Sequence, residues 1–310
     1  MIARFDLTGI DEVKEAQPHF AHTPLAHLSY LKPDHVYAYW LDAIAEDLAD
    51  ECSVAFVSRN SERIDGLAVY TDSAWDTKTV GRRVALINHL AGVVDSTRGS
   101  EILRAVVGEV LQHAARRGTD CLTCRVQVLD CTAIHALECH GFRLMDTLLN
   151  FLFDSLRTPL ESITVQKQPN GLHIRLAAQE DLPEVLALTE KTFATYFGRY
   201  YSDPKMPPGT GTKVYDQWVR SSFEGWADWI LVAEIDDRIA GYTMGKKPSV
   251  LELNHSLDIA HCNFGGIRCD ADSTELRDAL RPADARQQLS GTSGYTGARL
   301  EDYWRKTLFS

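Results

Sequence analysis

VYAYWL at residues 36–41 has a counterpart in VYDQWV at residues 214–219, and both follow the pattern Val-Tyr-x-x-Trp plus an apolar residue. A second pair shares the pattern Arg-Ile-x-Gly, in RIDGL at residues 63–67 and RIAGY at residues 238–242. The two members of each pair are separated by almost the same length of chain. Because two patterns recur in the same order at nearly the same displacement, the sequence indicates an internal duplication.

The segments around these motifs repeat as well. Apolar stretches typical of strands, SVAFVS at residues 53–58 and WILVAEI at residues 229–235, precede the two Arg-Ile-x-Gly motifs. Farther along, EILR at residues 101–104 corresponds to ELRD at residues 275–278, and each begins a helical pattern. Three pairs of similar segments thus occur in the same order at nearly the same displacement, which favours duplication over coincidence.

The duplication predicts two domains, in keeping with a chain of 310 residues, which is long for one compact domain. We expect a first domain at residues 1–156 and a second at residues 172–310. Residues 157–171, RTPLESITVQKQPNG, are polar with two prolines and a glycine, as is typical of a linker. The second domain is expected to be incomplete, because the chain stops at Ser310.

The first domain shows the clearer secondary-structure pattern. From Ile102 the apolar residues follow helical spacing, and Gly118 ends the predicted helix. A strand at residues 121–128, a short helix at 132–139 and a strand at 144–153 are expected to follow. This order predicts an α/β fold of the α+β type, in which helices flank a mixed central sheet.

The composition limits the classes of partner. The net charge is −11, which argues against a nucleic-acid duplex or an anionic membrane surface held through phosphate contacts. No apolar run is long enough to span a membrane, and the first residues lack a signal-peptide pattern. We therefore expect a cytoplasmic protein that binds a small molecule. The sequence leaves a homodimer open.

The seven cysteines do not form an extracellular disulfide pattern. Cys121 and Cys124 form a CxxC motif, for which a zinc site is one interpretation. The motif lies in a predicted strand, where residues three apart point to opposite faces. We therefore expect buried thiols and no metal.

The turn VVDSTRGS, residues 93–100, lies between a predicted strand and the start of a helix. Unpaired amides and the positive end of the helix dipole make such a turn an anion site. The predicted contacts to a pyrophosphate come from five residues of this turn: Val93, Val94, Arg98, Gly99 and Ser100.

The strand order, the Arg-Gly at a helix start and the Gly-Phe pair at residues 141–142 together resemble the GCN5-related N-acetyltransferase (GNAT) superfamily. Within it, the chain is similar to the TDP-fucosamine acetyltransferase group. This similarity rests on Trp75-Asp76, RVQ at 125–127, HGF at 140–142, RYYSDP at 199–204, Tyr215, Trp218, and Ala233-Glu234 leading to RIAGY. The resemblance implies two tandem GNAT-like domains that use acetyl-CoA as co-substrate.

The chain departs from the family's pyrophosphate loop, Gln/Arg-x-x-Gly-x-Gly/Ala. In the first domain Glu101 and Leu103 replace the two glycines, and only Arg98 is retained. The corresponding residues 272–277, DSTELR, retain neither the arginine nor a glycine. An acidic side chain beside a pyrophosphate is repulsive.

The resemblance also implies a tyrosine that protonates the departing CoA thiolate. Leu137 occupies that position in the first domain, whereas Tyr303, on a predicted helix, is the candidate in the second. Gly265 and Gly266, followed by Ile267, are candidate contacts for the pantetheine arm if the glycines mark a strand bulge; otherwise they form a loop with close backbone approach.

The function implied by the resemblance is N-acyl transfer, from acetyl-CoA or another acyl-CoA, to a small-molecule amine such as an amino sugar. Two alternatives stay open at this stage. One is a catalytically degenerate GNAT-like binding or scaffolding protein, and the other is a different thioester reaction on the same fold.

Overall fold

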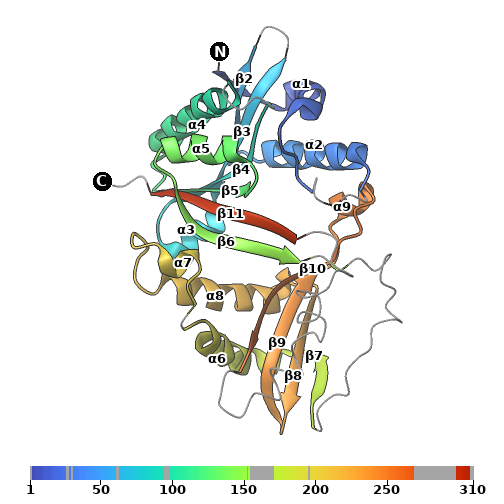
Figure 1. Cartoon of the computed structure of the whole chain (residues 1–310). Helices are drawn as coiled ribbons and strands as arrows, with labels where there is room; N and C mark the ends of the chain where they lie inside the picture. Colours follow the sequence, from blue (N-terminus) through green and yellow to red (C-terminus); the bar gives the residue numbers. More distant parts are fainter. Residues whose placement is uncertain are drawn as a thin grey trace.

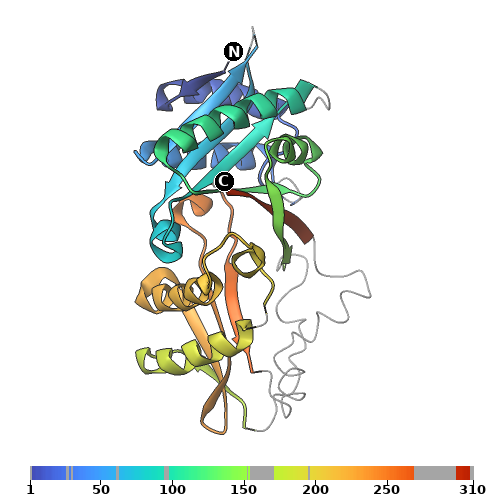
Figure 2. The same ribbon diagram turned by 90° about the vertical axis from the view of Figure 1, so that its left-hand side faces the viewer.

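The computed structural model describes residues 2–25, 28, 31–60, 63–93, 98–151, 153, 171–194, 196–268 and 298–307. These residues form two β-sheets, each with its own helices, stacked one above the other (Figures 1 and 2). The larger sheet has the strand order β1-β2-β3-β4-β5-β11-β6, and the smaller one the order β10-β9-β8-β7. We call the part built on the larger sheet the first unit and the part built on the smaller sheet the second unit.

The strands of the first unit are β1 (Ile2–Phe5), β2 (Ser53–Arg59), β3 (Ile64–Ser73), β4 (Val84–Gly92), β5 (Cys121–Gln127), β6 (Arg143–Phe151) and β11 (Ala298–Thr307). Its helices are α1 (Ile10–Ala16), α2 (Pro33–Ala49), α3 (Ala74–Val80), α4 (Arg98–Arg117) and α5 (Cys131–Cys139). All neighbouring strands are antiparallel except β4 and β5, which are parallel. The sheet is therefore mixed, as expected.

Helices cover both faces of this sheet, because alternate residues of its strands are apolar on both sides. Ala55 and Val57 of β2 belong to the core beneath α1 and α2, whereas Phe56 between them belongs to the core beneath α4 and α5. Figure 1 shows the two helix pairs on opposite sides of the sheet. Buried strands with helices on both faces explain the near-continuous apolar pattern of β2 and β3.

The second unit is smaller and follows the same order. Its strands are β7 (His173–Leu176), β8 (Trp229–Ile235), β9 (Arg238–Lys246) and β10 (His261–Ile267), all paired antiparallel. Its helices are α6 (Leu182–Phe193), α7 (Arg199–Ser202), α8 (Thr210–Ser221) and α9 (Val250–Asn254). Val185, Leu188 and Val219 of α6 and α8 pack on one face of this sheet.

The repeat extends to the register of the strands. The two Val-Tyr-x-x-Trp motifs lie in α2 and α8, and the Arg-Ile-x-Gly motifs begin β3 and β9.

Each unit also has a β-bulge at an asparagine, Asn88 in β4 and Asn263 in β10. The two asparagines are as far apart in sequence as the two Arg-Ile-x-Gly motifs. The pairs that flank the bulges are Val69↔His89 and Tyr70↔Ile87 in the first unit, and Met244↔Phe264 and Gly245↔Cys262 in the second. The third repeated pair cannot be compared in this way, because its second member, residues 275–278, lies outside the described residues.

One segment differs from the sequence expectation. Residues 298–303 were expected to be a helix of the second unit, but residues 298–307 form strand β11 between β5 and β6 of the first sheet. The expected linker falls almost entirely on residues outside those described. The chain thus returns to the first sheet after building the second unit.

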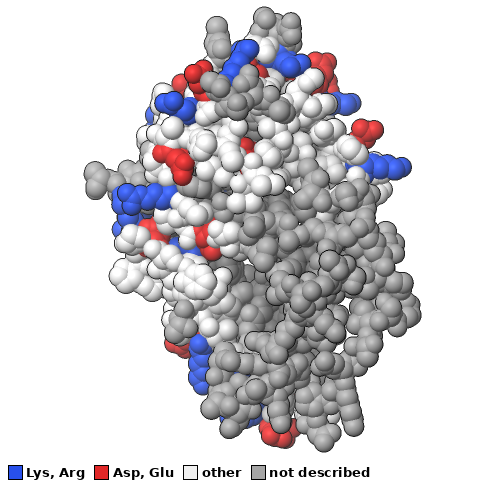
Figure 3. Space-filling view, in the orientation of Figure 1, with Lys and Arg blue, Asp and Glu red and all other residues white. Residues whose placement is uncertain are grey.

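On the face drawn in Figure 3, the basic and acidic side chains of the described residues are interspersed around the first unit. Among the described residues, no helix combines the length and the apolar character needed to cross a bilayer.

We expect the variant that ends at residue 297 to be destabilised, because losing β11 leaves the facing edges of β5 and β6 unpaired. Its melting temperature should fall by about 5 °C or more relative to the full chain, measured by circular dichroism. The matched control ends at residue 307 and keeps the whole strand. Equal melting temperatures for all three chains would show that β11 is not a member of this sheet.

Candidate functional site

An opening between β4 and β5 is the central feature of the first unit. The two parallel strands pair from Val84↔Cys121 to Ile87↔Cys124 and no farther, although β4 continues to Gly92 and β5 to Gln127. The bulge at Asn88 comes directly after the last pair. Because a bulge bends its strand and increases the local twist, it separates β4 from β5 beyond this point.

The end of β4 and the first residues of α4 lie at the end of this opening. Four of the five predicted pyrophosphate contacts, Val93, Arg98, Gly99 and Ser100, lie here, and Val94 falls outside the described residues. A Cβ atom on Gly99 would lie 2.8 Å from the carbonyl oxygen of Val93. Glycine is therefore required for the first turn of α4 to approach the end of β4 this closely.

An acidic side chain, Asp65, lies beside the guanidinium of Arg98 and was not among the predicted site residues. Nη2 of Arg98 lies 3.8 Å from Oδ2 of Asp65, whose side chain is only 5% exposed. Oδ1 of Asp65 has no hydrogen-bond partner among the described residues. The signal was available in the repeat, because the second unit has Ala240 at the position of Asp65. A buried carboxylate this close weakens the attraction of Arg98 for an anion.

Leu103 has a structural role in place of the expected glycine. Its side chain is buried, and a Cβ atom on Gly92 would lie 2.9 Å from Cγ of Leu103. The leucine thus packs against the backbone at the end of β4.

The segment Phe20–Thr23 crosses the opening from β4 to β5. The N–H of Ala21 donates to the carbonyl oxygen of Gly92 at 2.8 Å, and Phe20 forms an antiparallel bridge with Val93. At the other side, Nε2 of Gln127 donates to the carbonyl oxygen of Thr23 at 2.9 Å. An extended backbone therefore fits along this part of β4.

The segment Phe20–Thr23 pairs with the part of β4 that no longer pairs with β5, on the same edge of that strand. Val93 donates its N–H to the carbonyl oxygen of Asp65 in β3 at 3.1 Å. In an extended strand, the carbonyl and the N–H of one peptide unit point in opposite directions. The carbonyl of Gly92 consequently points away from β3, toward the side of β5.

The second unit repeats this edge with different partners. Arg268 donates its N–H to the carbonyl oxygen of Ala240 at 2.9 Å, which matches the bond from Val93 to Asp65. The carbonyl of Ile267 then corresponds to that of Gly92 and accepts from Oγ1 of Thr192 at 3.3 Å. Within the described residues, β10 is the end strand of its sheet.

The two glycines of β10 do not mark the bulge. The register shift lies between Cys262 and Phe264, before Gly265 and Gly266. A Cβ atom on Gly265 would lie 2.8 Å from the carbonyl oxygen of Tyr242, so the backbone approach is close, but both glycines lie in strand β10 and not in a loop. The contact of Gly265, Gly266 and Ile267 with a pantetheine arm stays a prediction.

Tyr303 lies in a strand, not on the expected helix. Its partners in the register are Arg125 of β5 and Asp146 of β6. Leu137 is fully buried in the core beneath α5. The acid role of Tyr303 stays a prediction.

The two cysteines of the CxxC motif point to different faces of β5. Cys124 lies in the core with α4 and α5, whereas Cys121 packs with Val80 and Val84. Burial raises the pKa of the Cys124 thiol strongly, which keeps it protonated. In the part of the chain that the structure describes, no three His, Cys, Asp or Glu side chains are grouped to hold a metal ion.

A polar network lies at the bulge on the α2 side. Trp40 Nε1 donates to Nδ1 of His89 at 3.0 Å, and Nε2 of His89 lies 3.1 Å from Oδ2 of Asp47. Because the indole can only donate, Nδ1 of His89 accepts and Nε2 carries the proton toward Asp47. Asn88 also donates to Asp47, at 2.9 Å. Both ring nitrogens of His89 are thus engaged, and the imidazole positions Asp47.

Burial alone would raise the pKa of Asp47, but the hydrogen bonds from His89 and Asn88 outweigh it and hold the pKa below its usual value. The carboxylate is therefore ionised at neutral pH. Its ionisation favours the folded state.

Two solved structures resemble the whole chain. One is a tandem GNAT protein from the clavulanic acid biosynthesis pathway, with a TM-score of 0.52 and 12% identity over 99% of this chain and 98% of that chain. The other is a GCN5-related N-acetyltransferase from Sphaerobacter thermophilus, with a TM-score of 0.55 and 14% identity over 98% of this chain and 95% of that chain. The chain shares the α/β fold of these proteins.

No family model matches the sequence. A spore coat polysaccharide biosynthesis protein, SpsD of Bacillus subtilis (strain 168), is 23% identical over 185 residues. That alignment spans 60% of this chain and 60% of SpsD.

We expect Asp47→Asn to remove a part of the acid sensitivity of folding. Because the pKa of Asp47 is lowered in the folded state, its stabilising effect is present above the unfolded value of 3.8 and is lost as the pH falls through the folded value. The melting temperature of the variant should lie below that of the parent at about pH 6.5 and approach it near pH 3.

Glu46→Gln is the matched control for this experiment, because it removes the same charge one residue away on an exposed position of α2. A constant difference between Asp47→Asn and the parent across the pH range would contradict the assignment.

Proposed function

We propose that the protein is an acyl-CoA-dependent N-acyltransferase that transfers an acetyl group to a small-molecule amine. The observation that carries this proposal is the opening between β4 and β5, created by the bulge at Asn88 next to the start of α4. The similarity of the fold to tandem acetyltransferases supports it.

The backbone edge of β4 suits the arm of acetyl-CoA. The pantetheine arm is an extended chain with two amide groups, so it can exchange hydrogen bonds with a free strand edge. The segment Phe20–Thr23 already pairs with Gly92 and Val93 in this manner. Binding of the arm would therefore require this segment to move aside.

The start of α4 would hold the pyrophosphate. The first amides of a helix lack intrahelical partners and lie at its positive end. Gly99 permits the close approach of this turn to β4, and Arg98 adds a cation. Asp65 and Leu103 oppose this role, and the affinity expected of such a site is correspondingly reduced.

The reaction needs few chemical groups from the protein. The neutral amine attacks the thioester carbonyl, the C–N bond forms, and the C–S bond breaks. The nitrogen loses one proton and the departing thiolate takes one up. Backbone N–H groups beside the opening would stabilise the charge that develops on the carbonyl oxygen.

We further propose an amino sugar as the acceptor. This proposal rests on the distant similarity to a spore coat polysaccharide biosynthesis protein. No metal enters the proposed reaction.

The second candidate function is a binding module without catalysis. The pairing of Arg98 with Asp65 favours it, because the cation retained from the family's loop is already opposed by a buried carboxylate. The replacement of the loop glycines by Glu101 and Leu103 favours it as well.

Titration calorimetry with acetyl-CoA separates the two functions. We expect binding of acetyl-CoA to the full chain, a loss of about tenfold in affinity for Arg98→Ala, and a gain of several-fold for Asp65→Asn, which keeps the shape and removes the opposing charge.

Arg116→Ala is the matched control, because it removes the same charge at the far end of α4 and should leave the affinity unchanged. Absence of binding at about 1 mM acetyl-CoA would contradict the transferase and support the binding module.

A further inference from the structure

The two units contact each other through two pairs of helices, and we call each of these helix–helix contacts a seam. Helix α3 of the first unit packs on α8 of the second, and α9 of the second unit packs on α2 of the first. Helices α2 and α8 correspond through their Val-Tyr-x-x-Trp motifs, and α3 and α9 both follow the strand that begins with Arg-Ile-x-Gly. The two seams are therefore counterparts and can be compared residue by residue.

The seam between α3 and α8 is filled with aromatic rings. Trp75 stacks on Trp218 with ring centroids 6.2 Å apart and an interplanar angle of 12°. Phe264 of β10 lies beside them, with its ring centroid 5.9 Å from that of Trp218 and 5.4 Å from that of Tyr215. These rings therefore pack against one another across the seam.

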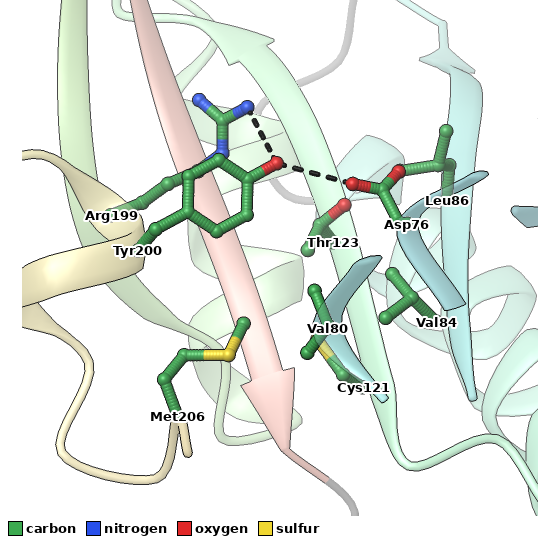
Figure 4. A pocket seen from close by; sticks show the side chains of 9 residues that line it. All are labelled: Asp76, Val80, Val84, Leu86, Cys121, Thr123, Arg199, Tyr200 and Met206. Carbon is green, nitrogen blue, oxygen red and sulfur yellow. Dashed lines mark hydrogen bonds between the residues drawn. The ribbon is translucent and has the colours of Figure 1, made fainter. Parts of the chain in front are cut away.

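A small hollow next to this seam is also closed. Its volume is about 10 Å³, no more than one water molecule requires. Figure 4 shows why: the ring of Tyr200 extends across it, and its hydroxyl lies between the guanidinium of Arg199 and the carboxylate of Asp76, to which it donates at 3.2 Å.

The seam between α2 and α9 is open. A pocket of about 550 Å³ lies here, within the range of small-molecule sites. Val250 stands at the position of Trp75 when the units are aligned on their Arg-Ile-x-Gly motifs, and its side chain is 76% exposed. His89 takes the position of Phe264 in the strand register. Smaller and polar residues thus replace the two rings that close the other seam.

The pocket is polar and carries negative charge. Both units contribute to its lining, which includes Tyr39, Glu46, Asp47, Asn88, His89 and Val250. Asp47 is ionised, as its hydrogen bonds from His89 and Asn88 require. Burial, and then the charges of Glu252 and Glu46, raise the pKa of Tyr39, so its phenol remains a neutral donor.

The second unit is held in place at this pocket by its own contacts. Nε2 of His255, just after α9, lies 2.7 Å from Oδ2 of Asp42 in α2. The imidazole ring of His255 also packs edge-on against the ring of Tyr39. The walls supplied by α2 and α9 therefore keep a defined separation.

The pocket adjoins the place where β4 leaves β5. Asn88 and His89 line it, and they directly follow Ile87, the last residue of β4 that pairs with β5. A molecule in the pocket would reach the carbonyl end of an acyl arm lying in the opening.

We propose that this seam pocket is the acceptor site, and that it binds a compact cationic amine with further hydroxyl groups. The carboxylates of Glu46 and Asp47 attract the ammonium form, which releases one proton to solvent before the neutral nitrogen attacks. The polar groups of Tyr39 and Asn88 provide partners for hydroxyls. The second unit then serves to complete the acceptor site of the first. This assignment rests on the proposed transferase function.

The test fills the pocket with the side chain found in the other seam. Glucosamine is the probe, and glucose is its counterpart without the charge. We expect the full chain to bind glucosamine more tightly than glucose, and Val250→Trp to weaken glucosamine binding by about tenfold in calorimetry. Glu46→Gln should weaken it by about threefold, as expected for an exposed charge.

Leu253→Trp is the matched control, since Leu253 is 54% exposed on the same helix and does not line the pocket. Its affinity for glucosamine should equal that of the parent, and acetyl-CoA binding should be unchanged in all these variants. Circular dichroism melts verify that each variant is folded.

Two outcomes overturn the assignment: equal affinities for glucosamine and glucose in the parent, or unchanged glucosamine binding in Val250→Trp. Either can occur while acetyl-CoA still binds, in which case the transferase proposal stands and the seam pocket is wrong. Absence of acetyl-CoA binding, by contrast, would contradict the transferase proposal itself.

Discussion

One extra residue in β4, Asn88, determines the arrangement on which the other features depend. A bulge adds a residue to one strand only, so β4 bends and its parallel pairing with β5 ends at Ile87. The backbone of β4 beyond this point has a free edge in the middle of a sheet, where an unpaired edge is costly unless something binds it. The segment Phe20–Thr23 satisfies that edge in this structure. An acyl arm with its own amides can satisfy it equally well, and this substitution is the basis of the proposed activity.

The same bulge occurs at Asn263 of the second unit, so the two units share this feature of their strand layout. In the second copy, Phe264 and its aromatic neighbours close the region around the bulge. In the first copy, His89 joins Trp40 and Asp47 in a polar network and the region stays open. The last described strand, β11, completes the sheet of the first copy. The proposed ligand site therefore lies in the first unit, and the second unit forms one wall of the seam pocket.

Local patterns of the sequence predicted a large part of this fold. The displacement of VYxxW and RIxG found the duplication, because these motifs pack at equivalent positions of α2 and α8 and of β3 and β9. The burial of Cys124 also followed from local rules. The failures involve residues far apart in sequence. The pairing of β11 with β5 and β6 and the pairing of Ala21 with Gly92 depend on tertiary contacts that no local pattern encodes. Tyr303 was assigned to a helix because the resemblance to the acetyltransferases implies a tyrosine on a short helix at this point of the second domain.

The most direct test of the account is hydrogen exchange at Ala21, measured by NMR with and without saturating acetyl-CoA. The amide of Ala21 donates to Gly92 on the edge that the acyl arm would take, whereas the amide of Val93 donates to β3 and should not be affected. If the arm binds in the opening, the exchange of Ala21 should become faster by about tenfold or more while that of Val93 stays the same. Unchanged protection of Ala21 under conditions where acetyl-CoA is bound would place the arm elsewhere and contradict the account.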